Sequence, residues 1–495
     1  MPELDTRPLV EELVPPPEPA HCCEQLAGLT YRLFLDSAAT GTRLGRYSFL
    51  SADPAIVVRS KGARTECVDL AAGTRCGMPG DALSVLHSLL EPHLAEPLVE
   101  LPPFQGGAAG YLAYDWGHQL ERLPYPRHDD LDLSDVVLGL YDWVLAWDHA
   151  AGRAWLVSTG IPETSAARRN RRKMRRAALV LERLRSTAPR GAPCTHDTRS
   201  ATDRRDDAPS YPVDDARAAR LGLRSSFTHR AYLDAVTRVR EYILAGDIFQ
   251  ANLSQRFDAP LRESAWDFYR RLRTRNAAPF AAFLDMPEAV VLSASPERFL
   301  SVDVGGNVET RPIKGTRPRG LGPEHDAALG QSLVESDKDR AENLMIVDLM
   351  RNDLSRVCAA GTVRVPELFA LERYATVHHL VSTVVGRLAP GMDALDLVRA
   401  AFPGGSITGA PKLRAMEIIA ELEPSRRGVY CGAIGYRSVT GTLDTNIAIR
   451  TTIARDGHLY FNAGGGIVAD SDPEQEYLET LDKARGIIDA MGGSA

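Results

Sequence analysis

Two pairs of acidic residues have the spacing that places both members of a pair on one face of a helix. Asp339 and Glu342 are three positions apart in one predicted helix, and Glu476 and Glu479 are three apart in another. Carboxylates on two helices could together hold Mg²⁺, which uses one or two protein carboxylates and keeps positions for water and substrate oxygens. Such pairs are also common on solvated helix faces, where they pair with neighbouring lysines and arginines.

Two other residues could act as an acid and as a nucleophile. Glu297 follows the apolar run 290–292, so we expect it at a strand end, where a dry pocket would raise its pKa and suit it to general acid catalysis. A surface glutamate beside an arginine is the alternative. Lys314 lies between Ile313 and Gly315, and an apolar neighbour helps to keep an amine neutral and nucleophilic. Because arginines flank it, a carboxylate-holding or phosphate-holding loop is an equally good interpretation.

Two glycine-rich stretches suit close approach to a ligand. One is Phe402-Pro-Gly-Gly-Ser-Ile-Thr-Gly-Ala-Pro-Lys before a predicted helix, and the other is Ala463-Gly-Gly-Gly-Ile-Val, expected after a strand. Neither contains G-x-G-x-x-G or G-K-[ST], which disfavours a nucleotide ligand. With Arg450 and Lys483, these features indicate a ligand that bears more than one carboxylate.

The elements that must position these residues alternate irregularly between helix and strand. The predicted helices lie at 333–353, 411–422 and 474–491, and the strand-like stretches at 289–293, 443–453 and 459–462. Because regular βαβ alternation is missing, the pattern favours antiparallel sheets with helices packed outside.

The chain divides into three predicted regions. Residues 1–185 form a strand-rich N-terminal region that packs on the catalytic core and ends in a basic helix at 168–185, which we interpret as a solvated helix. Residues 186–224 are rich in proline and polar residues and are predicted to be a mobile linker. Residues 225–495 form the catalytic domain, which opens with a helix capped by Thr228.

The composition excludes several classes of function. The chain has 495 residues, of which 44% are hydrophobic, and its net charge of −7 gives no general attraction to nucleic acid or anionic lipid. No apolar run approaches the length of a membrane-spanning helix, and the start of the chain, 1–19, is unlike a secretory signal, so we expect a cytoplasmic protein. The seven scattered cysteines fit reduced thiols, and His378-His379 lacks zinc-site spacing.

Taken together, these motifs resemble the chorismate-utilising enzymes, which include the anthranilate, aminodeoxychorismate, isochorismate and salicylate synthases. The match is dense over 228–490 and thinner upstream, through Arg46-Tyr-Ser and Gly106-Gly-Ala-Ala-Gly-Tyr-Leu-Ala-Tyr-Asp115. The resemblance implies an α+β fold in which two stacked, largely antiparallel β-sheets are flanked by outer helices.

The resemblance also implies roles for individual residues. Glu342 and Glu479 are expected to ligate Mg²⁺, which holds the ring carboxylate of chorismate, with Asp339 and Glu476 in support. Glu297 matches the general acid that protonates the departing C4 hydroxyl. The other residues implied are His379 near the ring and, as substrate-binding residues, Gln250, Thr316, Ser406, Tyr430, Arg450, Gly464, Gly466 and Lys483.

Two positions sort the reactions of this family. Gln250 stands where the water-adding relatives carry a lysine that activates water, and glutamine cannot act as a general base, so ammonia is the expected nucleophile. Aminodeoxychorismate synthases typically carry Pro-Ile-Lys-Gly-Thr around Lys314, whereas anthranilate synthases carry Pro-Ile-Ala-Gly-Thr. We expect Lys314 to add at C2 while Glu297 helps the C4 hydroxyl to leave, after which ammonia adds at C4 and expels the lysine. The expected product is 4-amino-4-deoxychorismate, on the route to p-aminobenzoate, and anthranilate synthase component I is the alternative.

Ammonia should come from a partner. The chain lacks the G-x-C-x-G elbow and the His-Pro-Glu of a glutaminase, so we expect a separate glutamine amidotransferase subunit. Leu35-Asp-Ser37 only partly resembles the Leu-Glu-Ser pattern of feedback-inhibited anthranilate synthases, which leaves open whether the N-terminal region binds tryptophan.

Overall fold

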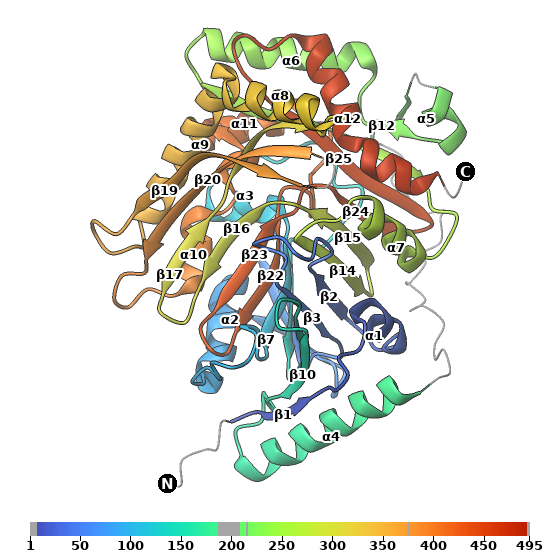
Figure 1. The fold of residues 1–495 in the computed structure, drawn as a ribbon, viewed down its shortest axis with the longest axis vertical. Coiled ribbons are helices and arrows are strands. Elements are labelled where there is room, and N and C mark those ends of the chain that lie inside the picture. The colour runs from blue at the N-terminus through green and yellow to red at the C-terminus, as the bar shows by residue number, and fades with distance from the viewer. Residues whose placement is uncertain (1–6, 187–207, 214–215, 375–376, 493–495) are drawn as a thin grey trace.

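The computed structural model describes residues 7–186, 208–213, 216–374 and 377–492 (Figure 1). Two large sheets, of 13 and 12 strands, form its centre. Neighbouring strands run antiparallel, as between Gln250–Pro260 and His458–Ile467. The predicted α+β class with two largely antiparallel sheets is therefore confirmed.

The strands follow one another in an order that repeatedly crosses between distant parts of the chain. The 13-stranded sheet runs β1 (Leu9–Glu12), β10 (Arg153–Ser158), β9 (Trp143–Asp148), β3 (Tyr47–Ser51), β2 (Arg32–Asp36), β14 (Phe280–Met286), β15 (Ala289–Ser295), β24 (Thr451–Arg455), β25 (His458–Ile467), β13 (Gln250–Pro260), β12 (Arg224–Ser225) and β11 (Tyr211–Pro212), with β21 (Gly409–Ala410) paired to β13. The 12-stranded sheet runs β18 (Ile313–Pro318), β20 (Val377–Arg387), β17 (Asn307–Thr310), β16 (Arg298–Val302), β23 (Leu443–Ile447), β22 (Ala433–Ser438), β7 (Gly107–Leu112), β8 (Val136–Tyr141), β4 (Ile56–Lys61), β5 (Arg64–Asp69) and β6 (Thr74–Met78), with β19 (Arg364–Arg373) paired to β20.

Helices surround the two sheets. They are α1 (Pro19–Gln25), α2 (Ala82–Leu90), α3 (Gly117–Leu120), α4 (Ala166–Arg185), α5 (Ala216–Leu221), α6 (His229–Leu244), α7 (Ala265–Arg275), α8 (Pro323–Val334), α9 (Asp337–Ser355), α10 (Ala394–Ala401), α11 (Lys412–Leu422) and α12 (Pro473–Met491). In Figure 1, α6, α8, α11 and α12 gather at the top of the view and α4 lies at the bottom. Thr228 caps α6 as predicted, because its hydroxyl accepts the Ala231 N–H at 3.1 Å.

Strands from both halves of the chain meet in each sheet. In the larger sheet β2 pairs with β14, and in the smaller one β7 pairs with β22. The predicted N-terminal and catalytic regions therefore share both sheets. Most of the predicted linker, 187–207 and 214–215, lies outside the described residues, and its described remainder includes β11, α5 and β12 at one edge of the larger sheet.

Apolar side chains from both sheets meet in one buried cluster. Leu33 and Phe49 of the larger sheet and Tyr111 and Ile434 of the smaller one belong to it. Burial of each large apolar side chain contributes about 1.5–3 kcal/mol to the free energy of unfolding. This packing fixes the two sheets against each other and, with them, the strand ends that carry the predicted site.

Two predicted elements are broken in the structure. The helix predicted at 333–353 begins only at Asp337, because Ser336 caps α9 by accepting the Asp339 N–H at 3.3 Å, and the residues before it end α8. The strand predicted at 443–453 is two strands, β23 and β24, which belong to different sheets. Between them Arg450 adopts a positive φ of 50°, which turns the chain from one sheet to the other.

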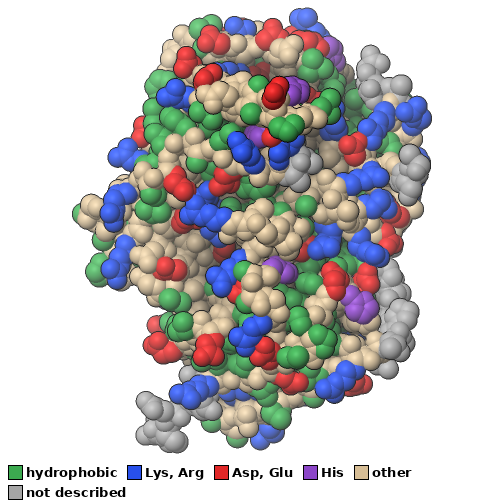
Figure 2. Space-filling model, viewed as in Figure 1, with side chains coloured by type: hydrophobic (Ala, Val, Ile, Leu, Met, Phe, Trp, Pro, Cys, Tyr) green, Lys and Arg blue, Asp and Glu red, His purple; other side chains and the backbone are tan. Residues whose placement is uncertain are grey.

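The surface mixes charges of both signs. Figure 2 shows Lys and Arg side chains interspersed with Asp and Glu side chains over the viewed face. In the part of the chain that the structure describes, no helix is both long and apolar enough to cross a lipid bilayer.

Candidate active site

The predicted acid pairs lie on α9, which packs on β18 and β20, and on α12, which packs on β25 beside β13. The two helices are tied to each other and to the sheet by lysines. Lys338 of α9 lies 3.6 Å from Glu476 of α12, and Lys483 of α12 donates to the Gly464 carbonyl of β25 at 2.8 Å. A site at this place receives side chains from both sheets and from both helices.

Glu297 is buried at the end of β15, with 4% of its surface exposed. Its carboxylate accepts the Ile313 N–H at 3.4 Å and a hydrogen bond from Ser406. Removal from water raises the pKa of Glu297 to about 7, although these hydrogen bonds and the charges of Lys314 and Arg450 act in the other direction. A carboxyl group that titrates near neutrality can hold a proton and deliver it, as general acid catalysis requires.

Lys314 lies in a strand and not in the loop that the sequence predicts. The register of β18 against β20 shifts between Ile313 and Thr316, so Lys314 and Gly315 form an irregularity. Gly315 has φ of +82°, and a Cβ there would lie 2.9 Å from a carboxylate oxygen of Asp339, so glycine permits this close approach to α9. Burial lowers the pKa of Lys314, which increases the neutral, nucleophilic fraction of its amine.

Gly464 and Gly466 lie within β25 and not after it as predicted. The physical reason is that they pair with β13 along a ladder of close backbone contacts. A Cβ on Gly466 would lie 1.8 Å from Nε2 of Gln250 and 3.4 Å from Nζ of Lys314, so both side chains converge over this glycine. Oε1 of Gln250 is buried and has no hydrogen-bond partner among the described residues, which leaves it available to a ligand.

Replacing Gly466 by alanine should raise the KM for the substrate at least about tenfold, which corresponds to about 1.4 kcal/mol of lost binding. The new methyl group would occupy the position of the Gln250 amide and displace it. Steady-state kinetics with Gly77→Ala as control test this, because a Cβ at Gly77 meets nothing within 4 Å. Equal KM values for both variants would contradict the placement of Gly466 in the site.

The carboxylates of α9 and α12 influence one another electrostatically. Burial raises the pKa of Glu342 and of Glu476, and neighbouring carboxylates raise both further. Glu479 differs, since its ion pair with Lys483 at 2.7 Å lowers its pKa. A Cβ on Gly465 would lie 3.1 Å from Glu476 and 3.6 Å from Glu479, so the two carboxylates of α12 stand over this glycine of β25.

The donor set fits Mg²⁺ better than a metal that needs a complete protein cage. Among the described residues, no group of three or more His, Cys, Asp or Glu side chains is arranged to hold a metal. Asp339 is engaged by Arg317 at 2.9 Å, Glu476 by Ser471 at 2.6 Å and Glu479 by Lys483 at 2.7 Å, so a metal on Glu342 and Glu479 would share Glu479 with this lysine. Mg²⁺ needs few protein carboxylates because water and substrate complete its coordination.

His379 is neutral, and one of its two ring nitrogens has no hydrogen-bond partner among the described residues. Its Nδ1 lies 2.9 Å from the Thr316 hydroxyl, and its Nε2 is buried without a hydrogen-bond partner in the described chain. Burial, together with the charge of Arg450, lowers the pKa of His379 to about 3. Thr316 is therefore engaged by His379. Tyr430 is buried, and the guanidinium carbon of Arg427 lies 5.9 Å from its ring. The roles of these residues toward substrate stay predictions.

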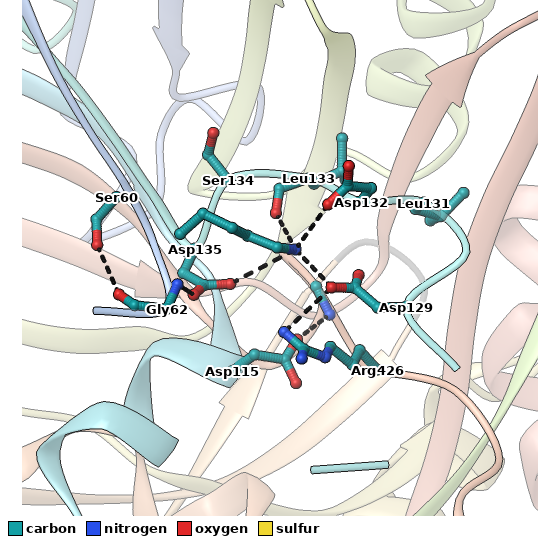
Figure 3. A network of polar contacts seen from close by, with 12 residues as sticks. Ser60, Gly62, Asp115, Asp129, Leu131, Asp132, Leu133, Ser134, Asp135 and Arg426 are labelled. Atoms are coloured by element: carbon teal, nitrogen blue, oxygen red, sulfur yellow. Dashed lines mark hydrogen bonds and ion pairs between the residues drawn. The ribbon is translucent and has the colours of Figure 1, made fainter. Parts of the chain in front are cut away.

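A polar framework, none of whose residues was predicted from the sequence, holds the turn before Tyr430. The Gly428 N–H donates to Asp115 at 2.7 Å, and Arg426 pairs with Asp129 at 3.1 Å (Figure 3). Asp129 also pairs with Lys61 at 2.7 Å. The signals in the sequence are the aspartate-rich stretch from 129 to 135 and the adjacent arginines at 426 and 427, but nothing in either shows that they meet.

A cavity of about 220 Å³ lies apart from the site, and none of the predicted site residues lines it. Leu35, Asp36 and Ser37 line one side, and Arg298 and Asn446 line another. It is therefore the environment of the Leu-Asp-Ser stretch whose ligand the sequence leaves open.

Comparisons with known proteins agree with this geometry. The model of a family described as chorismate binding enzyme matches residues 33–489. The chain is 41% identical to the aminodeoxychorismate synthase component 1 of Klebsiella aerogenes over 472 residues, 94% of each protein. It is 43% identical to the anthranilate synthase component 1 of Streptomyces coelicolor over 413 residues, 83% of this chain and 78% of that protein.

A solved structure extends the likeness to three dimensions. The crystal structure of anthranilate synthase component I from Streptococcus pneumoniae superposes with a TM-score of 0.74 at 32% identity and covers 90% of this chain and 92% of that one. The matched segment includes every residue of the candidate site, from Gln250 to Lys483. The chain therefore belongs to the family of chorismate-binding enzymes.

Proposed function

We propose that the chain converts chorismate and ammonia to 4-amino-4-deoxychorismate, on the route to p-aminobenzoate, with Lys314 as covalent nucleophile. The observation that carries this proposal is the half-buried Lys314 in the same site as the buried Glu297, where the charge of each group acts on the pKa of the other. Relatives named aminodeoxychorismate synthase component 1 that match 93–94% of the chain support it.

The chemistry divides one difficult substitution into two. The neutral amine of Lys314 forms a bond to C2 as the ring double bonds shift, and the C4 hydroxyl leaves as water with the proton of Glu297. Ammonia then forms a bond to C4, the double bonds shift back, and the bond between C2 and the lysine nitrogen breaks. The surplus proton of the added ammonia returns to the Glu297 carboxylate, so the enzyme ends in its starting state.

Glu342 and Glu479 would hold Mg²⁺, with Asp339 and Glu476 beside them. When bound, the ion would neutralise a substrate carboxylate and orient it against the two helices. Lys483 already reaches both Glu479 and the Gly464 carbonyl, so it fixes α12 against β25 on this side of the site.

Glu479→Gln should raise the Mg²⁺ concentration for half-maximal activity by about 10–100-fold, because an amide is a much weaker ligand than a carboxylate. Glu474→Gln on the same helix is the matched control, since Glu474 is about half exposed and pairs with His229. A titration of activity with Mg²⁺ measures both. Identical titration curves for the two variants would remove Glu479 from the metal site.

The product separates this function from its alternative. Relatives named anthranilate synthase component 1 reach 43% identity but match only 79–83% of the chain, so an ortho-aminated product is the weaker alternative. Incubation of the pure chain with chorismate, Mg²⁺ and a high concentration of ammonium near neutral pH decides, with the product identified by mass and ultraviolet absorbance. The 4-amino product retains the enolpyruvyl ether, and anthranilate lacks it.

The nitrogen donor in this proposal is a separate glutamine amidotransferase subunit. Ammonium predominates over ammonia at neutral pH, so a supply of nascent ammonia from a partner would be effective. The relatives' designation as component 1 supports a partner. If glutamine alone sustained turnover by the pure chain, the separate subunit would be unnecessary.

A further inference from the structure

One buried arginine connects three segments that carry the predicted substrate-binding residues. The Arg427 side chain is 1% exposed and directs its N–H groups to three places. Two of them bind Glu423 at 2.7 and 2.9 Å, one binds the Asn252 carbonyl at 2.6 Å, and one binds the Ile407 carbonyl at 3.0 Å. Its guanidinium carbon also lies 4.5 Å from the centre of the Tyr114 ring.

The carboxylate partner extends the connection along β13. Glu423 is 3% exposed in its side chain and accepts the Ser254 N–H at 2.8 Å and the Ser254 hydroxyl at 2.9 Å. In the sheet, Asn252 stands opposite Gly466 and Ser254 stands opposite Gly464. The ion pair is therefore hydrogen-bonded to β13 at Asn252 and Ser254, the two residues that pair with the glycines predicted to bind substrate.

The other ends of the connection reach Ser406 and Tyr430. Ile407, whose carbonyl binds Arg427, directly follows Ser406, and Ser406 hydrogen-bonds the Glu297 carboxylate. Tyr430 comes three residues after Arg427 in the same turn. A displacement of the Arg427 guanidinium would therefore displace β13, the Ser406 turn and the Tyr430 turn together.

We infer that Arg427 and Glu423 are positioning residues for chorismate, which set the distances between the glycine strand, Ser406 and Tyr430. This inference rests on the proposed function, because the contacts affected are those to chorismate. An ion pair suits the task since a planar guanidinium can bind a carboxylate and two carbonyls in fixed directions, which a lysine ammonium cannot do. Loss of either partner would also leave a buried charge unpaired.

The test compares Arg427→Lys and Glu423→Gln with Arg32→Lys. Arg32 forms a similarly buried ion pair with Asp285 at 3.0 Å between β2 and β14, away from the site. For each variant, thermal stability is measured first, and then KM and kcat for chorismate consumption per folded molecule with ammonium as donor. Ser254→Ala serves as a milder variant, because it removes one hydrogen bond to Glu423 and keeps the ion pair.

Positioning predicts that Arg427→Lys and Glu423→Gln raise the KM for chorismate at least about tenfold, with a smaller fall in kcat, and that Ser254→Ala raises KM about threefold. Arg32→Lys should lose stability with KM unchanged. The inference is wrong if Arg427→Lys and Glu423→Gln lose stability as the control does but keep KM within about twofold. It is also wrong if these two variants do not fold and Ser254→Ala leaves KM unchanged. Because chorismate consumption is followed, a wild-type product other than the 4-amino compound would overturn the proposed function without deciding this comparison.

Discussion

Lys314→Ala should yield no 4-amino-4-deoxychorismate above background while still binding chorismate. The amine is the only group in the proposed scheme that can occupy C2 while the C4 hydroxyl leaves, and no other described lysine approaches Gly466 as closely as the 3.4 Å of its Nζ. With alanine at this position C2 is open to ammonia, so any residual amination should give the ortho product. Mass and ultraviolet absorbance of the products distinguish the two.

Lys314→Arg separates a nucleophilic role from an electrostatic one. Arginine keeps a positive charge close to Glu297 and Glu342 but is not deprotonated in proteins and cannot form the adduct. If the amine acts as nucleophile, the arginine variant is as inactive as the alanine variant. If Lys314→Arg formed the 4-amino product at a rate near that of the wild type, Lys314 would only bind substrate carboxylates. This is the alternative that its flanking arginines also allow.

Local patterns in the sequence were enough for most of the elements around the site. The helix at 411–422 is found as α11 and that at 474–491 as α12, because their apolar spacing lies within the segments themselves. The continuous strand predicted at 443–453 failed because β-branched residues continue across the crossing between the sheets. Only the contact of each half with its own sheet decides where such a strand breaks.

In the candidate site, too, some residues could be predicted from the sequence and others could not. Glu297, Lys314 and the acid pairs could be selected from residue type and family motifs, and the structure brings them around β18 and β25. The residues that hold these side chains in place could not be predicted from the sequence. Asp115 meets Gly428 across 313 positions in the sequence, and neither residue has a local pattern that reveals the other. Arg427 is not among the residues predicted from the sequence, and it becomes functional in our interpretation only because three carbonyl and carboxylate partners surround it.

Glu297→Gln should lower kcat by about 10²–10⁴-fold, the usual contribution of a general acid. Glutamine keeps the size of the side chain and its contacts with Ile313 and Ser406 but has no proton to give to the leaving hydroxyl. In the wild type, activity should be lost as pH rises through about 7, where burial places the pKa of Glu297. Chorismate consumption is measured at a constant concentration of free ammonia, so that a change in the nucleophile does not mask this limb. If the activity of Glu297→Gln fell over the same pH range as that of the wild type, the titrating group would be one other than Glu297.

The same substitution should stabilise the protein above neutral pH. The folded state holds the Glu297 proton more tightly than the unfolded chain, so the contribution of this group to stability is complete below pH about 4 and is lost as pH rises through about 7. Glutamine carries no charge to bury, so thermal unfolding at pH 8 should show the variant more stable than the wild type, by up to about 3 kcal/mol, and at pH 4 the difference should vanish. A variant less stable than the wild type at pH 8 would mean that the carboxylate is stabilised by its surroundings. In that case it would be ionised throughout the working range and could not protonate the leaving hydroxyl.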